Sequence, residues 1–412
     1  MTKAVVPLSG EPLGMSSADE DLARLHLDDA AADGPAEPTG GRGGYGYESA
    51  EEQKAIAAQR SAIWAWIRGL GLHLLKDGLS LTTVSMPVTL FEARSWTQRV
   101  CDNWSYLHLL ELAAQETDAA SRLRLVVAFA IGGLRRQVGF LKPFNPLLGE
   151  TFAGTYACGA SVAVEQVSHH PPVTAWELRG SHGRYVYSGS GAWHASARGN
   201  TVRGSQSGEH CVVFAADGAR VTWSLPELTV HGALWGRRSL EYDGKVCFED
   251  HLHRLRVDVT INEAGPGLFK SIFKRGIART KVHDAVKGDL VRLPDDGVAA
   301  ASSTSSVSTA ASSASSAKPQ VLDTLSGSWL TRLEWAHGLG HGQLHVVWDA
   351  KRAPISGLAP SDRCLPSDAR LRKDLVRLAE GRLEEAQAEK VALEQAQRAD
   401  RKLRKAGGGP DS

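Results

Sequence analysis

Residues 165–172 read Glu-Gln-Val-Ser-His-His-Pro-Pro and are the most informative stretch of this chain. Side chains alternate between the two faces of a strand, so His169 and His170 cannot point the same way within a regular strand. Pro171 and Pro172 cannot donate hydrogen bonds to a sheet, and they stiffen the chain that leaves it. The pattern therefore predicts a strand that ends at the histidine pair. Both imidazoles would then lie at the rim of a sheet, where their N–H groups can bind an anion.

The chain around this stretch, from about residue 150 to 350, has the pattern of short strands. Runs typical of strands occur at residues 162–167, 184–187, 211–214, 220–223 and 344–348. Asp217-Gly218 and Asp243-Gly244 are typical of hairpin tips. Regularly spaced strands without intervening helices predict an antiparallel sandwich or barrel.

Helical patterns flank the strands on both sides. Residues 49–70 predict an amphipathic helix with Trp64 on its apolar side, which suits a membrane interface, a lid over an apolar cavity, or simple packing on the core. Residues 87–140 are mostly helical in pattern, and the run at 125–131 is apolar on all sides, which predicts a buried helix. Residues 367–405 are helical again, with acidic residues before basic ones.

Composition predicts which parts of the chain fold. Residues 1–47 are rich in Ala, Asp, Gly and Pro, and residues 299–318 are almost entirely Ser, Thr and Ala, so both are expected to be disordered. The same is expected of residues 406–412. The folded domain is therefore expected over residues 48–405.

Overall composition excludes several classes of protein. The 412 residues are 42% hydrophobic and 23% charged, an ordinary balance for a soluble domain, and the net charge of +1 argues against nucleic-acid binding. The longest apolar run, residues 125–134, is about half of the ~20 residues that cross a bilayer, and the N-terminus lacks the pattern of a signal peptide. Five dispersed cysteines without a CxxC pair argue against a disulfide scaffold or a thiolate zinc site.

A second informative stretch is residues 142–152, Lys-Pro-Phe-Asn-Pro-Leu-Leu-Gly-Glu-Thr-Phe. Two prolines three residues apart, followed by a glycine, predict a rigid turn before the first strand. Such a turn holds the Lys142 ammonium, the Asn145 amide and free backbone N–H groups in place as an anion cradle. The alternative is that Pro and Asn only build the turn while Lys142 is solvated.

A third stretch lies on the C-terminal helix. Lys390, Glu394 and Arg398 are spaced by four and fall on one helix face, where Glu394 can tether both cations and aim them at a shared ligand. The alternative is a solvent-facing ladder of ion pairs.

The three stretches together resemble the oxysterol-binding protein family. Residues 165–172 match the family's signature, residues 142–152 its other strong block and the Lys390 stripe its C-terminal block, in the same order. The resemblance covers about residues 50–405. It implies a mainly β fold with flanking helices: a near-complete antiparallel β-barrel around a hydrophobic tunnel, an N-terminal helical lid over residues 48–75, and C-terminal helices over 367–405.

The resemblance also implies a function and a site. Family members carry one lipid at a time between membranes, and commonly exchange a sterol, or in some branches phosphatidylserine, for phosphatidylinositol 4-phosphate in one tunnel. The phosphoinositide head group would be bound by Lys142, the Phe144 backbone, Asn145, His169, His170, Lys390, Glu394 and Arg398. The lid and tunnel would contribute Trp64, Ile67 and Leu70, with Gln137 meeting a sterol hydroxyl.

This reading implies a short family member without a pleckstrin-homology domain, because only about 47 residues precede the lid. We expect a cytoplasmic monomer that is peripheral on organelle membranes and needs no metal, cofactor or nucleic acid. One alternative is an enzyme that uses His169, His170 and Glu165 as a metal or acid–base site, although no known catalytic fingerprint occurs. Another is a lipid sensor or scaffold, which sequence does not separate from a carrier.

Overall fold

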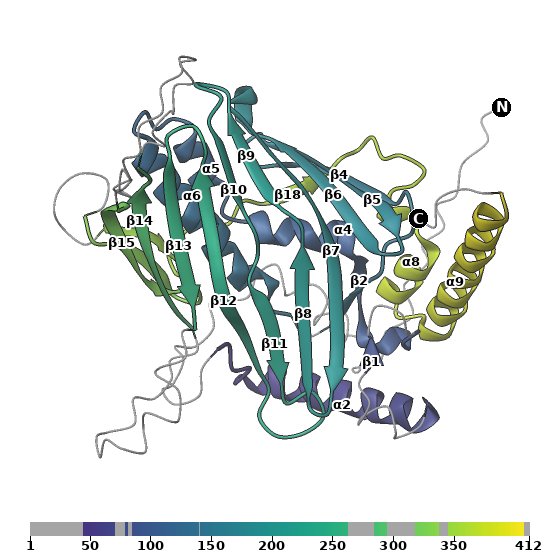
Figure 1. Ribbon diagram of the computed structural model, residues 1–412. Helices are drawn as coiled ribbons and strands as arrows, with labels where there is room; N and C mark the ends of the chain where they lie inside the picture. The colour runs from purple at the N-terminus through teal and green to yellow at the C-terminus, as the bar shows by residue number, and fades with distance from the viewer. Residues whose placement is uncertain are drawn as a thin grey trace, which may run out of the picture.

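The computed structural model describes residues 44–70, 79–80, 85–139, 141–262, 284–294, 318–337 and 345–407. Its largest element is a 16-stranded sheet that curves around a group of helices (Figure 1). The strands are β1 (Leu79–Ser80), β4 (Thr151–Tyr156), β5 (Ser161–His169), β6 (Pro172–Arg179), β7 (Tyr185–Arg198), β8 (Thr201–Ser207), β9 (His210–Phe214), β10 (Arg220–Trp223), β11 (Glu227–His231), β12 (Ser239–Asp250), β13 (Leu255–Ile261), β14 (Ala285–Arg292), β15 (Gln320–Ser328), β16 (Arg332–Trp335), β17 (His345–Asp349) and β18 (Leu358–Pro360).

All pairings in this sheet are antiparallel, and its main path runs from β17 through β12 and β7 to β18. Within the described residues, β17 and β18 are the two ends of that path, so the sheet is curved and open there. A separate parallel pair joins β2 (Phe91–Ser95) to β3 (Lys142–Phe144). The predicted fold class, mainly β with flanking helices, is confirmed.

Helices lie on the concave side of the sheet and at one end of it (Figure 1). The α-helices are α2 (Ala50–Leu70), α4 (Trp96–Arg99), α5 (His108–Ala113), α6 (Ala119–Gly133), α8 (Lys373–Ala379) and α9 (Leu383–Ala406). The 3₁₀ turns are η2 (Val88–Leu90), η3 (Val100–Trp104), η4 (Leu134–Gln137), η5 (Ser181–Gly183) and η6 (Ala369–Leu371).

Helix α6 is the buried helix that the sequence predicts. It begins where the Asp118 carboxylate accepts a hydrogen bond from the Ser121 backbone N–H at 2.7 Å, and almost all its side chains are buried. Arg124 is buried with them because its guanidinium pairs with Asp323 of β15 at 2.9 Å and lies over the Trp335 ring. The helix thus packs on the apolar face of the sheet.

Two glycine-containing turns were predicted, and only one is a turn. Asp217-Gly218 connects β9 to β10, with Gly218 at φ +73°. Asp243-Gly244 instead lies inside β12, so that prediction is wrong. Strand β12 pairs with β11 up to Asp243 and with β13 from Gly244 onward, and the positive φ of Gly244 marks this change of partner.

The helical pattern over residues 87–140 is interrupted by strand β2, which the sequence did not reveal. Phe91 pairs with Lys142 about fifty positions away, and local periodicity carries no information about such a partner. This pairing matters for function because it brings β2 alongside the predicted anion cradle.

The domain begins earlier than predicted. Tyr45 bridges to Leu240 of β12, and Tyr47 is buried and donates a hydrogen bond to the Gly139 carbonyl, although both lie in the predicted tail. The remaining predicted disorder, at residues 1–43, 299–317 and 408–412, falls outside the described residues.

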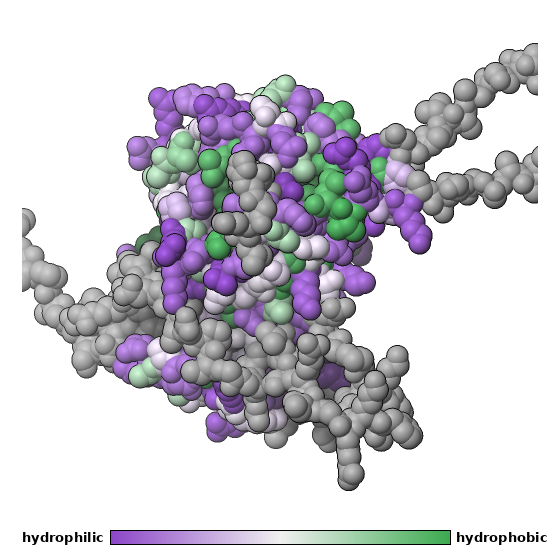
Figure 2. Space-filling view, turned by 90° about the vertical axis from the view of Figure 1, so that its left-hand side faces the viewer, coloured by the Kyte–Doolittle hydropathy of each residue, from purple (hydrophilic) through white to green (hydrophobic). Residues whose placement is uncertain are grey.

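The interior of the sheet is lined by aromatic side chains. Tyr187 of β7, Trp223 of β10 and Phe248 of β12 stack face to face, and Trp104 of η3 meets Tyr187 edge to face. On the outside, the face beside β14 and β15 is mostly hydrophilic, with separate hydrophobic patches (Figure 2). The chain thus encloses an apolar interior, while the predicted lipid tunnel stays a prediction.

Candidate anion-binding site

The turn after β3 forms one side of the site. The Lys142 ammonium donates to the Asn145 side-chain carbonyl at 2.5 Å, while Phe144 is buried against Phe91 with ring centroids 4.7 Å apart. The turn departs from expectation in one respect. The backbone N–H groups of Leu147, Gly149 and Glu150 donate to the Glu150 carboxylate, the Gln166 carbonyl and the Leu147 carbonyl. These three donors are already used within the protein, so the side chains are left to bind an anion.

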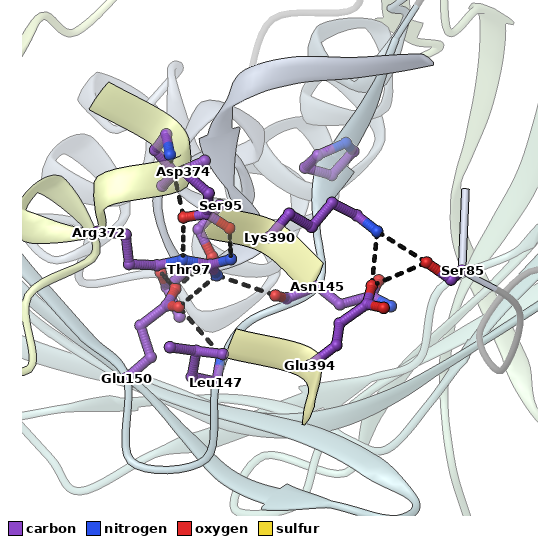
Figure 3. A network of polar contacts seen from close by, with 12 residues as sticks. Ser85, Ser95, Thr97, Asn145, Leu147, Glu150, Arg372, Asp374, Lys390 and Glu394 are labelled. Carbon is purple, nitrogen blue, oxygen red and sulfur yellow. Dashed lines mark hydrogen bonds and ion pairs between the residues drawn. The ribbon is translucent and has the colours of Figure 1, made fainter. Parts of the chain in front are cut away.

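Helix α9 forms the opposite side. The buried Lys390 ammonium lies 2.5 Å from Glu394 and 3.1 Å from the Ser85 hydroxyl, which itself donates to Glu394 at 3.2 Å (Figure 3). Arg398 lies 3.5 Å from the other oxygen of Glu394. The predicted stripe therefore has its expected geometry, and Ser85 is an additional member that its position in the sequence did not indicate.

The ring of Phe91 brings the two sides together. Lys142 Nζ lies 4.9 Å and Lys390 Nζ 5.5 Å from its centroid, a cation–π distance for each. Burial, and to a lesser extent the Lys390 charge, together lower the pKa of Lys142 to about 7, while the Glu394 charge opposes them. Two ammonium groups thus share one aromatic ring near a single carboxylate, with which only Lys390 pairs directly, and the local charge is positive.

The histidine pair joins the same site from the end of β5. Because the strand ends at His169, its alternation does not extend to His170, and the two rings lie edge to face with centroids 4.7 Å apart. The Pro146 carbonyl of the cradle turn lies close enough to His169 to raise its pKa, which opposes the effect of burial. Burial is the main cause that lowers the pKa of His169, with His170 and the α9 residues Arg401 and Arg404 adding to it.

The structure therefore brings the side chains of all three motifs to one edge of the sheet. Lys142, Asn145, Lys390 and Glu394 form its centre, and His169 is linked through the cradle turn. Phe91 and Ser85 were missed because each lies far in sequence from its partners, whereas Arg401 and Arg404 fall outside the four-residue spacing that defined the Lys390 stripe. The contact predicted for the Phe144 backbone stays a prediction. Among the residues the structure describes, no three His, Cys, Asp or Glu side chains converge as metal ligands would.

The sequence model described as "Oxysterol-binding protein" matches residues 72–410 of this chain. The chain belongs to the oxysterol-binding protein family. It is 31% identical over 354 residues to Oxysterol-binding protein 9 of Dictyostelium discoideum, covering 84% of this chain and 76% of that protein. It is 30% identical over 208 residues to human Oxysterol-binding protein-related protein 5, covering 49% of this chain but only 23% of that larger protein.

Solved structures of the oxysterol-binding family share this fold. The Osh1 ORD domain in complex with cholesterol superposes with a TM-score of 0.64 at 21% identity, covering 96% of this chain and 90% of that one. The Osh3 ORD in complex with PI(4)P from Saccharomyces cerevisiae has a TM-score of 0.62 at 22% identity, covering 85% of each chain. At these identities the likeness establishes the fold.

The segment predicted to form a lid, residues 48–75, holds helix α2 over residues 50–70; residues 71–75 lie outside the described residues, and the lid role stays a prediction. Ile67 is buried against Ala233 and Leu234 of the β11–β12 connection, and Trp64 stacks on Trp235 with centroids 6.4 Å apart. Arg60 donates to the Gly232 and Gly236 carbonyls and fastens the helix there. The side chain of Leu70 lies outside the described residues.

Gln137 is not left open for a sterol hydroxyl in this structure. Its side-chain oxygen accepts a hydrogen bond at 3.0 Å from the hydroxyl of Tyr242, a buried residue of β12. A ligand hydroxyl would therefore have to compete with Tyr242 for this oxygen. No helix among the described residues is long and apolar enough to span a bilayer.

Proposed function

We propose that this protein extracts single lipids from membranes and carries them, binding the head group of phosphatidylinositol 4-phosphate at the rim and a sterol in the apolar interior. The observation that carries the proposal is the excess of positive charge at the rim. Lys390 and Arg398 both pair with the carboxylate of Glu394, and Lys142 adds a third cation near enough to be influenced by its charge. A phosphomonoester carries close to two negative charges at pH 7, and buried or half-buried ammonium groups are suitable partners for it.

The apolar interior supports the second half of the proposal. Lipid tails gain about 0.8 kcal/mol for each methylene that leaves water, and the aromatic concave face supplies an apolar environment. The solved relatives were crystallised with cholesterol in one case and PI(4)P in the other. We propose that the two lipids exclude one another here, since both would occupy the same interior. Phosphatidylserine is the second candidate for the sterol's place.

The direct test is extraction from liposomes by a variant that lacks both imidazoles. His169→Ala with His170→Ala should abolish extraction of phosphatidylinositol 4-phosphate and leave sterol extraction intact. A matched control replaces two histidines on other strands, His194→Ala with His231→Ala, and should retain both activities. Unchanged extraction of both lipids by the first variant would refute the head-group assignment.

The protein is further proposed to act without chemical conversion, as a carrier peripheral to cytoplasmic membrane surfaces. Lipids recovered after extraction should have unchanged masses. Transfer of fluorescent lipid between two liposome populations separates a carrier from a sensor. Many lipids moved per protein molecule indicate a carrier, whereas uptake that stops at one lipid per protein indicates a sensor.

A further inference from the structure

A second polar network lies directly behind the cradle turn and is not part of the proposed head-group site. It consists of Glu150 at the end of the turn, Arg372 before α8 and Asp374 in its first turn (Figure 3). Their exposed fractions are 3%, 9% and 0%. A buried charged group is costly unless it is fully paired, so this arrangement requires a specific role.

The guanidinium of Arg372 uses all three of its nitrogens. Nε and Nη2 donate to the two oxygens of Asp374 at 3.1 and 2.6 Å, and Nη1 donates to Glu150 at 2.7 Å and to the Asn145 carbonyl at 3.0 Å. The same group lies 5.5 Å from the centroid of the Phe144 ring. Arg372 therefore touches the backbone of one cradle residue and the side chain of the residue before it.

Glu150 holds the other end of the turn. One of its oxygens accepts from the Leu147 N–H at 3.0 Å and from Arg372, and the other accepts from the hydroxyls of Ser95 and Thr97. Ser95 belongs to β2, the strand that carries Phe91. The two charged side chains thus fasten the turn at Asn145 and at Leu147, and tie it to the strand whose ring lies beneath both ammonium groups.

We propose that Arg372 and Glu150 are positioning residues for anion binding. They do not meet the head group, because their polar atoms are already paired within the protein. They fix the backbone at Asn145 and Leu147, and thereby the direction in which the Asn145 amide and its partner Lys142 face the ligand. This inference rests on the proposed function. It gives the segment just before α8 a role in anion binding at the cradle turn, which lies more than two hundred residues earlier in the sequence.

The test uses Arg372→Lys, which keeps the positive charge but cannot reproduce the planar fork that reaches Asp374, Glu150 and the Asn145 carbonyl together. We expect affinity for phosphatidylcholine liposomes containing phosphatidylinositol 4-phosphate to fall about tenfold, as supporting partners of a ligand site typically contribute. Extraction of sterol from liposomes should be unchanged. This difference between the two ligands is a result that general destabilisation would not give.

Arg124→Lys is the matched control. Arg124 is also buried, also pairs with a buried aspartate and also lies over an aromatic ring, but its partners belong to β15 and β16, at the opposite end of the strand order from β4 and β5. The Arg124→Lys variant should leave the ratio of phosphoinositide affinity to sterol affinity unchanged. A fall in phosphoinositide affinity equal to that of Arg372→Lys would overturn the positioning role.

A second variant covers the case in which the first does not fold. Arg372→Met with Glu150→Gln and Asp374→Asn removes the cation together with both of its carboxylates, so no buried charge is left unpaired; this variant should fold and bind sterol, yet remain weak for the phosphoinositide. Normal phosphoinositide affinity in this variant, or in Arg372→Lys, overturns the inference while leaving the proposed function intact. Normal phosphoinositide affinity in Lys142→Ala with Lys390→Ala would instead overturn the proposed function itself.

Discussion

Two charged networks lie on either side of Asn145, and they differ in how their charges are paired (Figure 3). Behind the turn, Arg372 lies between two carboxylates, and each nitrogen of its guanidinium has a partner. In front of it, Lys142 and Lys390 share one aromatic ring, and only Lys390 pairs directly with a carboxylate, that of Glu394. The first network stabilises the protein as it stands, whereas the second leaves positive charge that an anionic ligand can neutralise.

The largest expected effect comes from breaking the network behind the turn. Arg372→Met leaves two buried carboxylates without their cation and should lower the free energy of unfolding by about 3–5 kcal/mol. Lys390→Met, in front of the turn, should lower it by less, because the Glu394 carboxylate left behind is partly exposed and keeps Arg398 as a partner. Unfolding in urea measures both. Equal losses of unfolding free energy in the two variants would show that the network behind the turn is no more important for stability than the one in front of it.

The next effect concerns the ligand. Lys142→Ala with Lys390→Ala removes both ammonium groups and should weaken extraction of phosphatidylinositol 4-phosphate roughly a hundredfold, because each hydrogen bond to a charged group contributes about 1.5–3 kcal/mol. Sterol extraction should be retained. The matched control is Lys245→Ala with Lys287→Ala, two exposed lysines on β12 and β14. Loss of phosphoinositide extraction by the control would point to a general effect of charge.

The shared aromatic ring gives a smaller effect. Phe91→Leu keeps most of the apolar volume but removes the π face beneath both ammonium groups, a contribution of about 1–2 kcal/mol when desolvated. Phosphoinositide affinity should therefore fall about tenfold, since 1.4 kcal/mol corresponds to that factor. Phe152→Leu, an equally buried phenylalanine of β4, is the control. Similar losses in both variants would refute a role for the ring beyond packing.

The smallest effect is a dependence on pH. In the empty protein the pKa of Lys142 is about 7, so this side chain loses its charge as pH rises through neutrality. Phosphoinositide affinity should fall several-fold between about pH 7 and pH 9, a range in which the phosphomonoester is already fully ionised. Lys142→Arg should flatten the profile. A flat profile in the unmodified protein would contradict the assignment.

The same shift has a consequence for stability, with a definite sign. The folded pKa of Lys142 lies below its ordinary value of 10.5, so between about 7 and 10.5 the unfolded chain binds more protons than the folded one. The stability of the empty protein should therefore rise with pH across this window relative to Lys142→Met. Thermal unfolding at a series of pH values measures the difference, and a difference that does not change with pH would show that Lys142 remains charged in the folded protein.

The sequence predicted the charged residues of the candidate site better than it predicted the residues that hold them in place. His169, Lys142 and Lys390 each lie in a motif whose residue types and spacing indicate an anion, so a resemblance could join them before their distances were known. Phe91, Ser85 and Arg372 lie outside those motifs, and each is defined by a partner at least fifty positions away. No local period or spacing reports such a contact.

The errors have physical causes as well. Asp243-Gly244 has the composition of a hairpin tip, but Gly244 supplies a positive φ inside a long strand that changes partner there. The free N–H groups expected in the cradle turn are used by Glu150 and by neighbouring carbonyls. In both cases the sequence showed that the backbone is unusual at that position, but only the fold showed which residues it pairs with.

The central claim is that a lipid phosphate lies between Lys142 and Lys390. Phosphorus NMR of the protein loaded with phosphatidylinositol 4-phosphate tests it directly, because the phosphomonoester and the phosphodiester give separate resonances. The account predicts that Lys142→Ala and Lys390→Ala each shift the phosphomonoester resonance strongly and the phosphodiester resonance little. A phosphomonoester resonance that is the same in both variants as in the unmodified protein would contradict it.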